Sequence, residues 1–115
     1  MTITLHGIPN CDTVRKARGW LAAAGIDHRF HDLRKDGLTP AMLDRWIAAV
    51  GWEKLLNRSG TTFRALDPAD REGVDADKAV ALMLAHPALV RRPVLEGAGP
   101  VTIGFRPEHY EGLFA

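Results

Sequence analysis

Cys11 is the only cysteine in this chain of 115 residues, and it lies in the segment Gly7–Thr13, where a predicted strand gives way to a predicted helix. The unpaired backbone N–H groups at a helix start, with the positive end of the helix dipole, favour a thiolate over a thiol. The thiolate is the nucleophilic form of cysteine. Arg15, one helical turn further along the same side, adds positive charge nearby. We therefore expect Cys11 to be a nucleophile, the alternative being that it is a small buried apolar residue.

No second thiol is available to Cys11, because position 14 is Val14 and the motif is C-x-x-V rather than C-x-x-C. The chain therefore forms no internal disulfide, which favours a reducing compartment, and we expect a cytoplasmic protein. A mixed disulfide on Cys11 requires an outside thiol such as glutathione for its resolution. The single cysteine excludes a dithiol mechanism and a cysteine-based zinc site.

The composition indicates an ordinary soluble globular protein, with a hydrophobic fraction of 46% and a charged fraction of 25%. The formal net charge is +1, from 15 basic and 14 acidic residues, so we expect no nucleic-acid partner. No apolar run approaches the roughly 18 residues of a membrane span, and no signal peptide is predicted. We therefore expect no membrane partner.

The first third of the chain predicts a strand–helix–strand unit of about thirty residues. Residues 2–6 alternate polar and apolar side chains, as in a strand, and Gly7–Asn10 break the pattern. Residues 26–33 provide the second strand. The helix between them ends at Gly25, and its apolar positions have spacings of three and four: Val14, Ala17, Leu21 and Ala24.

The middle of the chain predicts helices. Thr39 and Pro40 are an N-cap and a first helical residue, and Gly51 ends that helix. Its apolar face comprises Met42, Leu43, Trp46, Ile47 and Val50. A short helical turn over 52–56 and a polar loop over 57–62 follow. Asp75 caps a further helix that stops at His86, before Pro87. The buried side of that helix is expected to be Ala76, Ala79, Val80 and Met83.

The end of the chain predicts a hairpin and a helix. Residues 94–95 and 101–105 flank the turn Gly97–Pro100, and Pro107 begins a short helix through Tyr110 and Leu113. The whole order predicts an α/β fold of thioredoxin-like plan, a four-stranded mixed sheet with flanking helices. We expect a single domain over 1–115 with a helical insertion at about 39–88.

Several segments together resemble the ArsC/Spx/YffB family, the arsenate reductase-like proteins. The segment Gly7–Ala17 is similar to the active-site segment of that family, and Arg92–Val94 and Gly104–Pro107 are similar to its later signatures. Gly51–Trp52 and Leu55–Thr62 resemble most closely the YffB-like branch. The resemblance covers essentially the whole chain and implies an ArsC-like variant of the thioredoxin-like fold.

The resemblance also implies roles for particular residues. In the arsenate reductases three arginines surround the cysteine that attacks the oxyanion, and Arg92 and Arg106 match two of them. The third position is Asn57 here, with Arg58 one place later, which counts against arsenate reduction. Planar guanidinium groups also suit a glutathione carboxylate. Pro93 is expected to follow a cis peptide bond and to face the cysteine.

Each of these residues also has a purely structural interpretation. Arg92 and Arg106, taken singly, are compatible with solvated surface charges, and Asn57 and Arg58 with closure of a loop. We nevertheless expect six residues to bind the substrate or glutathione: Arg15, Asn57, Arg58, Arg92, Pro93 and Arg106. No metal site is expected, since His28 and His31 are an odd number of residues apart and face opposite sides of a regular strand.

The function that follows is that of a thiol-dependent enzyme, a monothiol oxidoreductase that resembles the YffB-like glutathione-dependent thiol reductases. Its catalytic residue would be Cys11, and it would act on a small anionic or thiol substrate without a bound cofactor. Glutathione is the expected co-substrate, and glutaredoxin is a further expected partner. One alternative is an arsenate reductase that uses glutathione and glutaredoxin. Another is an Spx-like regulator that binds RNA polymerase, although such regulators often carry the C-x-x-C switch that Val14 denies here.

Overall fold

The structure is a computed structural model and describes residues 2–115. The chain forms two compact units. The first comprises the chain up to Gly37 together with Arg92–Ala115, and the second comprises Leu38–Arg91. The second unit spans the segment in which a helical insertion is expected. The single-domain assignment stays a prediction.

The first unit contains a four-stranded mixed sheet in the order β2-β1-β3-β4. Strand β1 (Thr4–Gly7) pairs in parallel with β2 (Arg29–Asp32) and antiparallel with β3 (Val94–Glu96). Strand β3 pairs antiparallel with β4 (Thr102–Ile103). This topology confirms the predicted mixed sheet and the predicted hairpin. Strand β2 is shorter than the predicted range 26–33. Strand β1 begins two residues later than the predicted range 2–6 and includes Gly7, which was expected to lie in the break after the strand, because Gly7 still pairs with Asp32 of β2.

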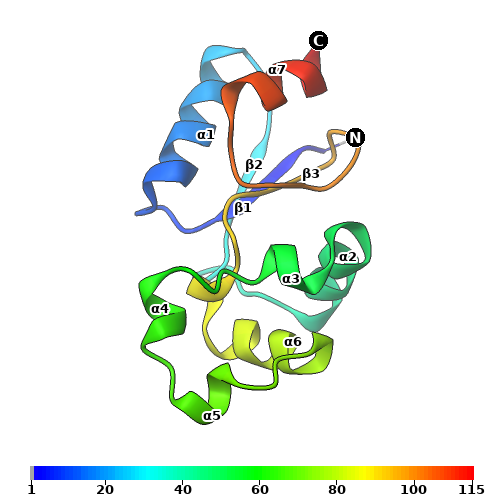
Figure 1. Cartoon of the computed structure of the whole chain (residues 1–115). Helices are drawn as coiled ribbons and strands as arrows, with labels where there is room; N and C mark the ends of the chain where they lie inside the picture. Colours follow the sequence, from blue (N-terminus) through cyan, green and yellow to red (C-terminus); the bar gives the residue numbers. More distant parts are fainter. Residues whose placement is uncertain (1) are drawn as a thin grey trace. The chain divides into compact units, whose positions relative to one another are not determined.

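Two helices of the first unit, α1 (Asp12–Ala23) and α7 (Pro107–Phe114), pack on the sheet (Figure 1). Pro107 occupies the first turn of α7, as predicted. Of the four apolar positions predicted for α1, Val14, Ala17 and Leu21 are buried, whereas Ala24 follows the last residue of the helix and is exposed. One cluster of buried core residues in this unit comprises Leu5, Ala17, Leu21, Leu95 and Tyr110. Burial of these side chains fixes α1, and with it the segment that carries Cys11.

The second unit is helical. Its elements are α2 (Pro40–Val50), α3 (Trp52–Leu55), α4 (Thr61–Arg64), α5 (Pro68–Arg71), α6 (Ala76–Ala85) and the 3-10 helix η1 (Pro87–Leu89). Both predicted N-caps are present. The Thr39 hydroxyl accepts from Met42 N at 3.3 Å, and the Asp75 carboxylate accepts from Lys78 N at 2.8 Å. These bonds satisfy backbone donors that the helix itself leaves unpaired.

Two expectations for the second unit are wrong. The predicted loop over 57–62 is too long, because α4 begins at Thr61. In α6, Ala76 is exposed and Val80 is half-buried, while Leu82 is buried beside Ala79 and Met83. The apolar pattern of α6 is nearly continuous, so its spacing alone did not select the face that packs. The short helices α4 and α5 were not predicted.

No helix among residues 2–115 is both long enough and apolar enough to span a membrane.

Candidate active site around Cys11

Cys11 is the N-cap residue of α1, with an extended backbone (φ −97°, ψ 127°). Its N–H donates to the carbonyl of Ile8 at 3.2 Å, which closes the short turn after β1, and its own carbonyl accepts from Arg15 N at 2.9 Å. The thiol makes no capping hydrogen bond within the described residues, and the residue is half-exposed. The backbone therefore holds Cys11 at a helix start, while the residue stays partly accessible.

Arg15 braces the turn beside Cys11. Its guanidinium pairs with the Asp12 carboxylate at 3.0 Å, and its Nε donates to the carbonyl of Pro9 at 3.4 Å. The Arg15 and Asp12 side chains are 58% and 85% exposed, so this pair contributes at most about 1 kcal/mol to stability. Arg15 thus has a local structural role, and its predicted role in substrate binding stays a prediction.

The sheet brings the later motifs to the end of the sheet at which Cys11 lies. In the antiparallel pair of β1 and β3, the end of β1 that leads to Cys11 lies beside the start of β3, directly after Pro93. Strand β4 runs antiparallel to β3, so the end of β4 that leads to Arg106 lies at this same end of the sheet. Gly104 N donates to the Pro93 carbonyl at 2.8 Å and ties these two segments together.

The Arg92–Pro93 peptide bond is cis, which confirms the prediction. Pro93 is buried. Arg92 is half-buried, and its Nε is enclosed without a hydrogen-bond partner among residues 2–115. Buried donors are nearly always paired, so this N–H is a donor without the acceptor that such a group usually has.

Arg106 is exposed and is the N-cap residue of α7. Its carbonyl accepts from His109 N at 3.1 Å and Tyr110 N at 3.2 Å, so the backbone of Arg106 is fixed by the helix. Its guanidinium and that of Arg92 form no ion pair within the described part of the chain. The first unit therefore contributes one cysteine and two uncompensated arginines at the same sheet end.

Asn57 and Arg58 belong to the second unit, and both make local contacts there. The Asn57 side-chain oxygen accepts from Ser59 N at 3.2 Å and from the Ser59 hydroxyl at 3.0 Å, which is an Asx turn. The Arg58 guanidinium lies 5.5 Å from the centre of the Trp52 ring, within cation–π range. The loop-closing interpretation thus describes Asn57, and the binding roles of both residues stay predictions.

Residues 6–113 match the model of the ArsC family. The chain belongs to the ArsC family. The solved structure of a YffB protein is 46% identical to the chain, with a TM-score of 0.95, and covers 99% of this chain and 100% of the other. The solution structure of an arsenate reductase (ArsC) related protein from Brucella melitensis is 54% identical, with a TM-score of 0.78 and coverage of 99% and 95%. The thioredoxin-like, ArsC-like fold is therefore shown.

Two curated relatives of the chain have different names. An uncharacterized protein of Haemophilus influenzae is 40% identical over 98% of this chain and 99% of its own length. The global transcriptional regulator Spx of Streptococcus pyogenes is 28% identical over 98% of this chain and 85% of its own. Both reductase-related and regulatory proteins are thus among the relatives.

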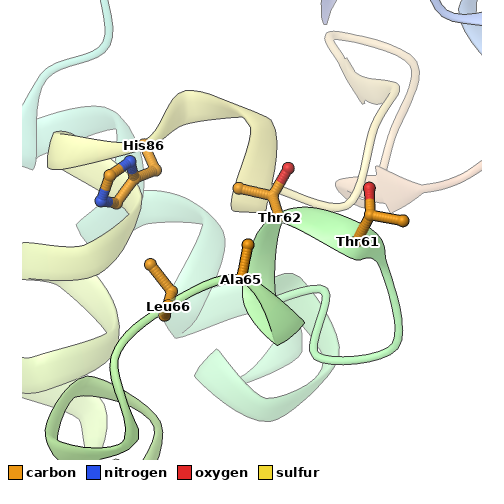
Figure 2. A pocket seen from close by; sticks show the side chains of 5 residues that line it. All are labelled: Thr61, Thr62, Ala65, Leu66 and His86. Atoms are coloured by element: carbon orange, nitrogen blue, oxygen red, sulfur yellow. The ribbon is translucent and has the colours of Figure 1, made fainter.

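One pocket of this ArsC-family chain lies within the second unit, with a volume of about 430 Å³. Figure 2 shows Thr61 and Thr62 on α4, with His86 on the other side of the pocket. Ala65 and Leu66 complete the lining, and no residue predicted for the site contributes to it. The pocket therefore includes Thr61 and Thr62 of the family-like segment Leu55–Thr62, but none of the residues proposed to bind substrate or glutathione.

Sequence reasoning missed a polar cluster on the sheet of the first unit. His6 is buried, and its Nε2 lies 2.8 Å from the Glu96 carboxylate. The ring of His31, on β2, is centred 5.0 Å from that of His6, and its Nε2 lies 2.7 Å from the Gly37 carbonyl. His6 and Glu96 are 90 residues apart, so no sequence spacing pointed to the pair. Among residues 2–115, no three His, Cys, Asp or Glu side chains are grouped to hold a metal ion.

Proposed function

We propose that this ArsC-family protein is a monothiol oxidoreductase that reduces disulfides of small molecules or proteins with glutathione as the electron donor. The observation that carries the proposal is the position of its only cysteine. Cys11 is half-exposed at the N-cap of α1, and its thiol makes no capping hydrogen bond within the described residues. A helix N-terminus stabilises the thiolate, which is the attacking form.

The chemistry proceeds in two thiol–disulfide exchanges. The Cys11 thiolate attacks the glutathionyl sulfur of a mixed disulfide, so that a Cys11–glutathione bond forms and the substrate leaves as a thiolate. A second glutathione thiolate then attacks the glutathionyl sulfur on Cys11, which releases oxidised glutathione and restores the Cys11 thiolate. The two steps together convert the mixed disulfide and one free glutathione thiol into the substrate thiol and oxidised glutathione, and the glutathione of the mixed disulfide enters already oxidised. The lack of a second cysteine in the chain makes the outside thiol obligatory.

Arg92 and Arg106 are the proposed binding groups for the carboxylates of glutathione or of an anionic substrate. Arg92 precedes β3 and Arg106 follows β4, both at the end of the sheet at which Cys11 lies. Neither guanidinium is neutralised by an ion pair within the described residues. Bidentate pairing of a guanidinium with a carboxylate gives strength and fixes direction. Pro93 shapes the backbone beside them. Glutaredoxin is a further partner that can remove glutathione from Cys11, and this thiol chemistry suits the cytoplasm.

Arsenate reduction is the second candidate, favoured by the 54% identical arsenate reductase related protein. Asn57 places a neutral amide where the resemblance implies a third guanidinium, and its oxygen is already engaged by Ser59. Arg58 stacks on Trp52. Charge-assisted hydrogen bonds are roughly twice as strong as neutral ones, so the compact arsenate anion loses more from this change than glutathione does.

The relatives named Spx favour a candidate of another class, a regulator that binds RNA polymerase. Val14, which is fully buried, stands where the C-x-x-C switch of such regulators has its second thiol. Pull-down of polymerase subunits by the purified protein, with no turnover of glutathione substrates, would favour the regulator over the reductase.

The experiment that tests the proposal is steady-state turnover of a small glutathione mixed disulfide, with oxidised glutathione recycled by glutathione reductase and NADPH. The expected result is saturable turnover by the wild-type protein and none above background by Cys11→Ser. Equal rates for the two proteins would contradict the proposal.

A further inference from the structure

Gly7, the last residue of β1, packs so closely against the Val14 side chain that it leaves no room for a side chain of its own. It is not among the glycines with positive φ, so its backbone conformation is open to any residue. A methyl group on its Cα would lie 2.8 Å from Val14 Cγ2 and 3.0 Å from Val14 Cγ1, where ordinary contacts are 3.4–4 Å. Gly7 therefore allows the first turn of α1 to approach the end of β1.

Val14 cannot easily yield to such a methyl group. It is fully buried and lies in the first turn of α1. A β-branched side chain in a helix strongly prefers one rotamer, so it has little freedom to rotate away. A side chain at position 7 would push the start of α1 away from the sheet by several tenths of an ångström.

Cys11 lies between these two residues in the chain. It is connected to Gly7 by a three-residue turn and to Val14 by the first turn of the helix, and its N–H and carbonyl are held by Ile8 and Arg15. A shift of the helix start therefore moves the backbone of Cys11 and the unpaired N–H groups of the first turn of α1. Misplacement of a reacting group by about 1 Å can cost up to 100-fold in rate.

We infer that Gly7 and Val14 are a pair of positioning residues, whose contact sets the place and the reactivity of the Cys11 thiol. The inference rests on the proposed role of Cys11 as the nucleophile. It also gives Val14 a function of its own in the C-x-x-V motif, since a valine at this position contributes the two methyl groups that pack on Gly7.

The test measures alkylation of Cys11 by iodoacetamide in the folded protein as a function of pH, with thermal unfolding measured on the same samples. Gly7→Ala should slow alkylation at pH 7 about tenfold, because the start of the helix that favours the attacking thiolate is displaced from its place beside Cys11. The double variant Gly7→Ala/Val14→Ala, which removes the clashing methyl groups, should return to within about threefold of wild type.

Gly19→Ala is the matched control. It is also a glycine-to-alanine substitution, but it lies within α1, where an added Cβ meets nothing within 4 Å. It should leave the alkylation profile unchanged. A folded Gly7→Ala variant with the wild-type profile overturns the inference. If Gly7→Ala does not fold, the double variant decides. A folded and reactive double variant supports the inference, and one that is slow or unfolded overturns it. Alkylation needs no glutathione, so it tests the positioning role separately from the proposed function. If the double variant recovers the alkylation rate but the wild-type protein does not turn over glutathione substrates, the proposed function is refuted and the inference on Gly7 and Val14 stands.

Discussion

Removal of the Tyr110 hydroxyl should stabilise the protein. Tyr110 is fully buried, and its Oη has no hydrogen-bond partner among residues 2–115. Its ring packs edge to face on Trp20, at 5.6 Å between centroids, and on Phe105, at 4.7 Å. Tyr110→Phe keeps these ring contacts. An unsatisfied buried polar group costs about 1–3 kcal/mol, so the free energy of unfolding should rise by that order.

The same substitution should change how stability depends on pH. Burial raises the pKa of the Tyr110 phenol far above its ordinary value. The folded state therefore keeps this proton more tightly than the unfolded state, in which tyrosine titrates near pH 10. Titration of this group therefore leaves the free energy of unfolding of the wild-type protein unchanged below about pH 10 and lowers it as the pH rises further. The advantage of Tyr110→Phe should thus grow above pH 10, by up to about 1.4 kcal/mol per pH unit.

Urea unfolding of both proteins between pH 7 and pH 11 measures these quantities. Tyr110 is the only tyrosine, so the ultraviolet absorbance of tyrosinate reports its titration directly and should appear only as the protein unfolds. Tyr110→Leu is the control, because it removes both hydroxyl and ring and should destabilise, with each aromatic pair worth about 0.5–1.5 kcal/mol. A Tyr110→Phe variant that is less stable than wild type at pH 7 would refute the reasoning, since the hydroxyl would then be satisfied.

Three further outcomes are expected. In steady-state kinetics, Arg92→Ala should raise KM for a glutathione mixed disulfide about tenfold or more. Arg91→Ala is the control and should leave KM unchanged, since Arg91 is exposed and its Nε donates to the Lys54 carbonyl. Lys78→Met should cost about 1 kcal/mol and speed limited proteolysis near α5, because the Lys78 ammonium donates to the carbonyl of Ala69 in α5 and to that of Glu72 just after it. Arsenate turnover should be at least about tenfold slower than mixed-disulfide turnover and unaffected by Arg58→Ala; fast turnover lost in that variant would show that Arg58 replaces the missing guanidinium.

The features that could be predicted from the sequence depend on neighbours within a few residues. Thr39 and Asp75 cap their helices through bonds to backbone groups three residues on, and Gly51 ends α2 with a positive φ of 87°. The hairpin and the cis bond before Pro93 came from a turn motif and from the family resemblance. Local chemistry and the order of elements were therefore enough for the fold class.

The features that could not be predicted depend on distant partners. Glu96 finds His6 only because β3 pairs with β1, and Leu82 rather than Ala76 is buried because other helices of the second unit determine the packed face. Asn57 lies at a position where the family resemblance suggests substrate binding, while its amide serves a turn with Ser59. Side-chain partners of this kind are set by tertiary packing, so spacing in the sequence carries no signal for them.

The central claim is that Cys11 alone exchanges with glutathione in the native protein. Mass spectrometry of the folded protein after incubation with oxidised glutathione tests it most directly. The expected result is one glutathionyl group per chain, located on Cys11, removed again by excess reduced glutathione and absent from Cys11→Ser. The denatured chain serves as the control for the intrinsic chemistry of the thiol. A native protein that stays unmodified, or reacts no faster than the denatured chain, would contradict the claim.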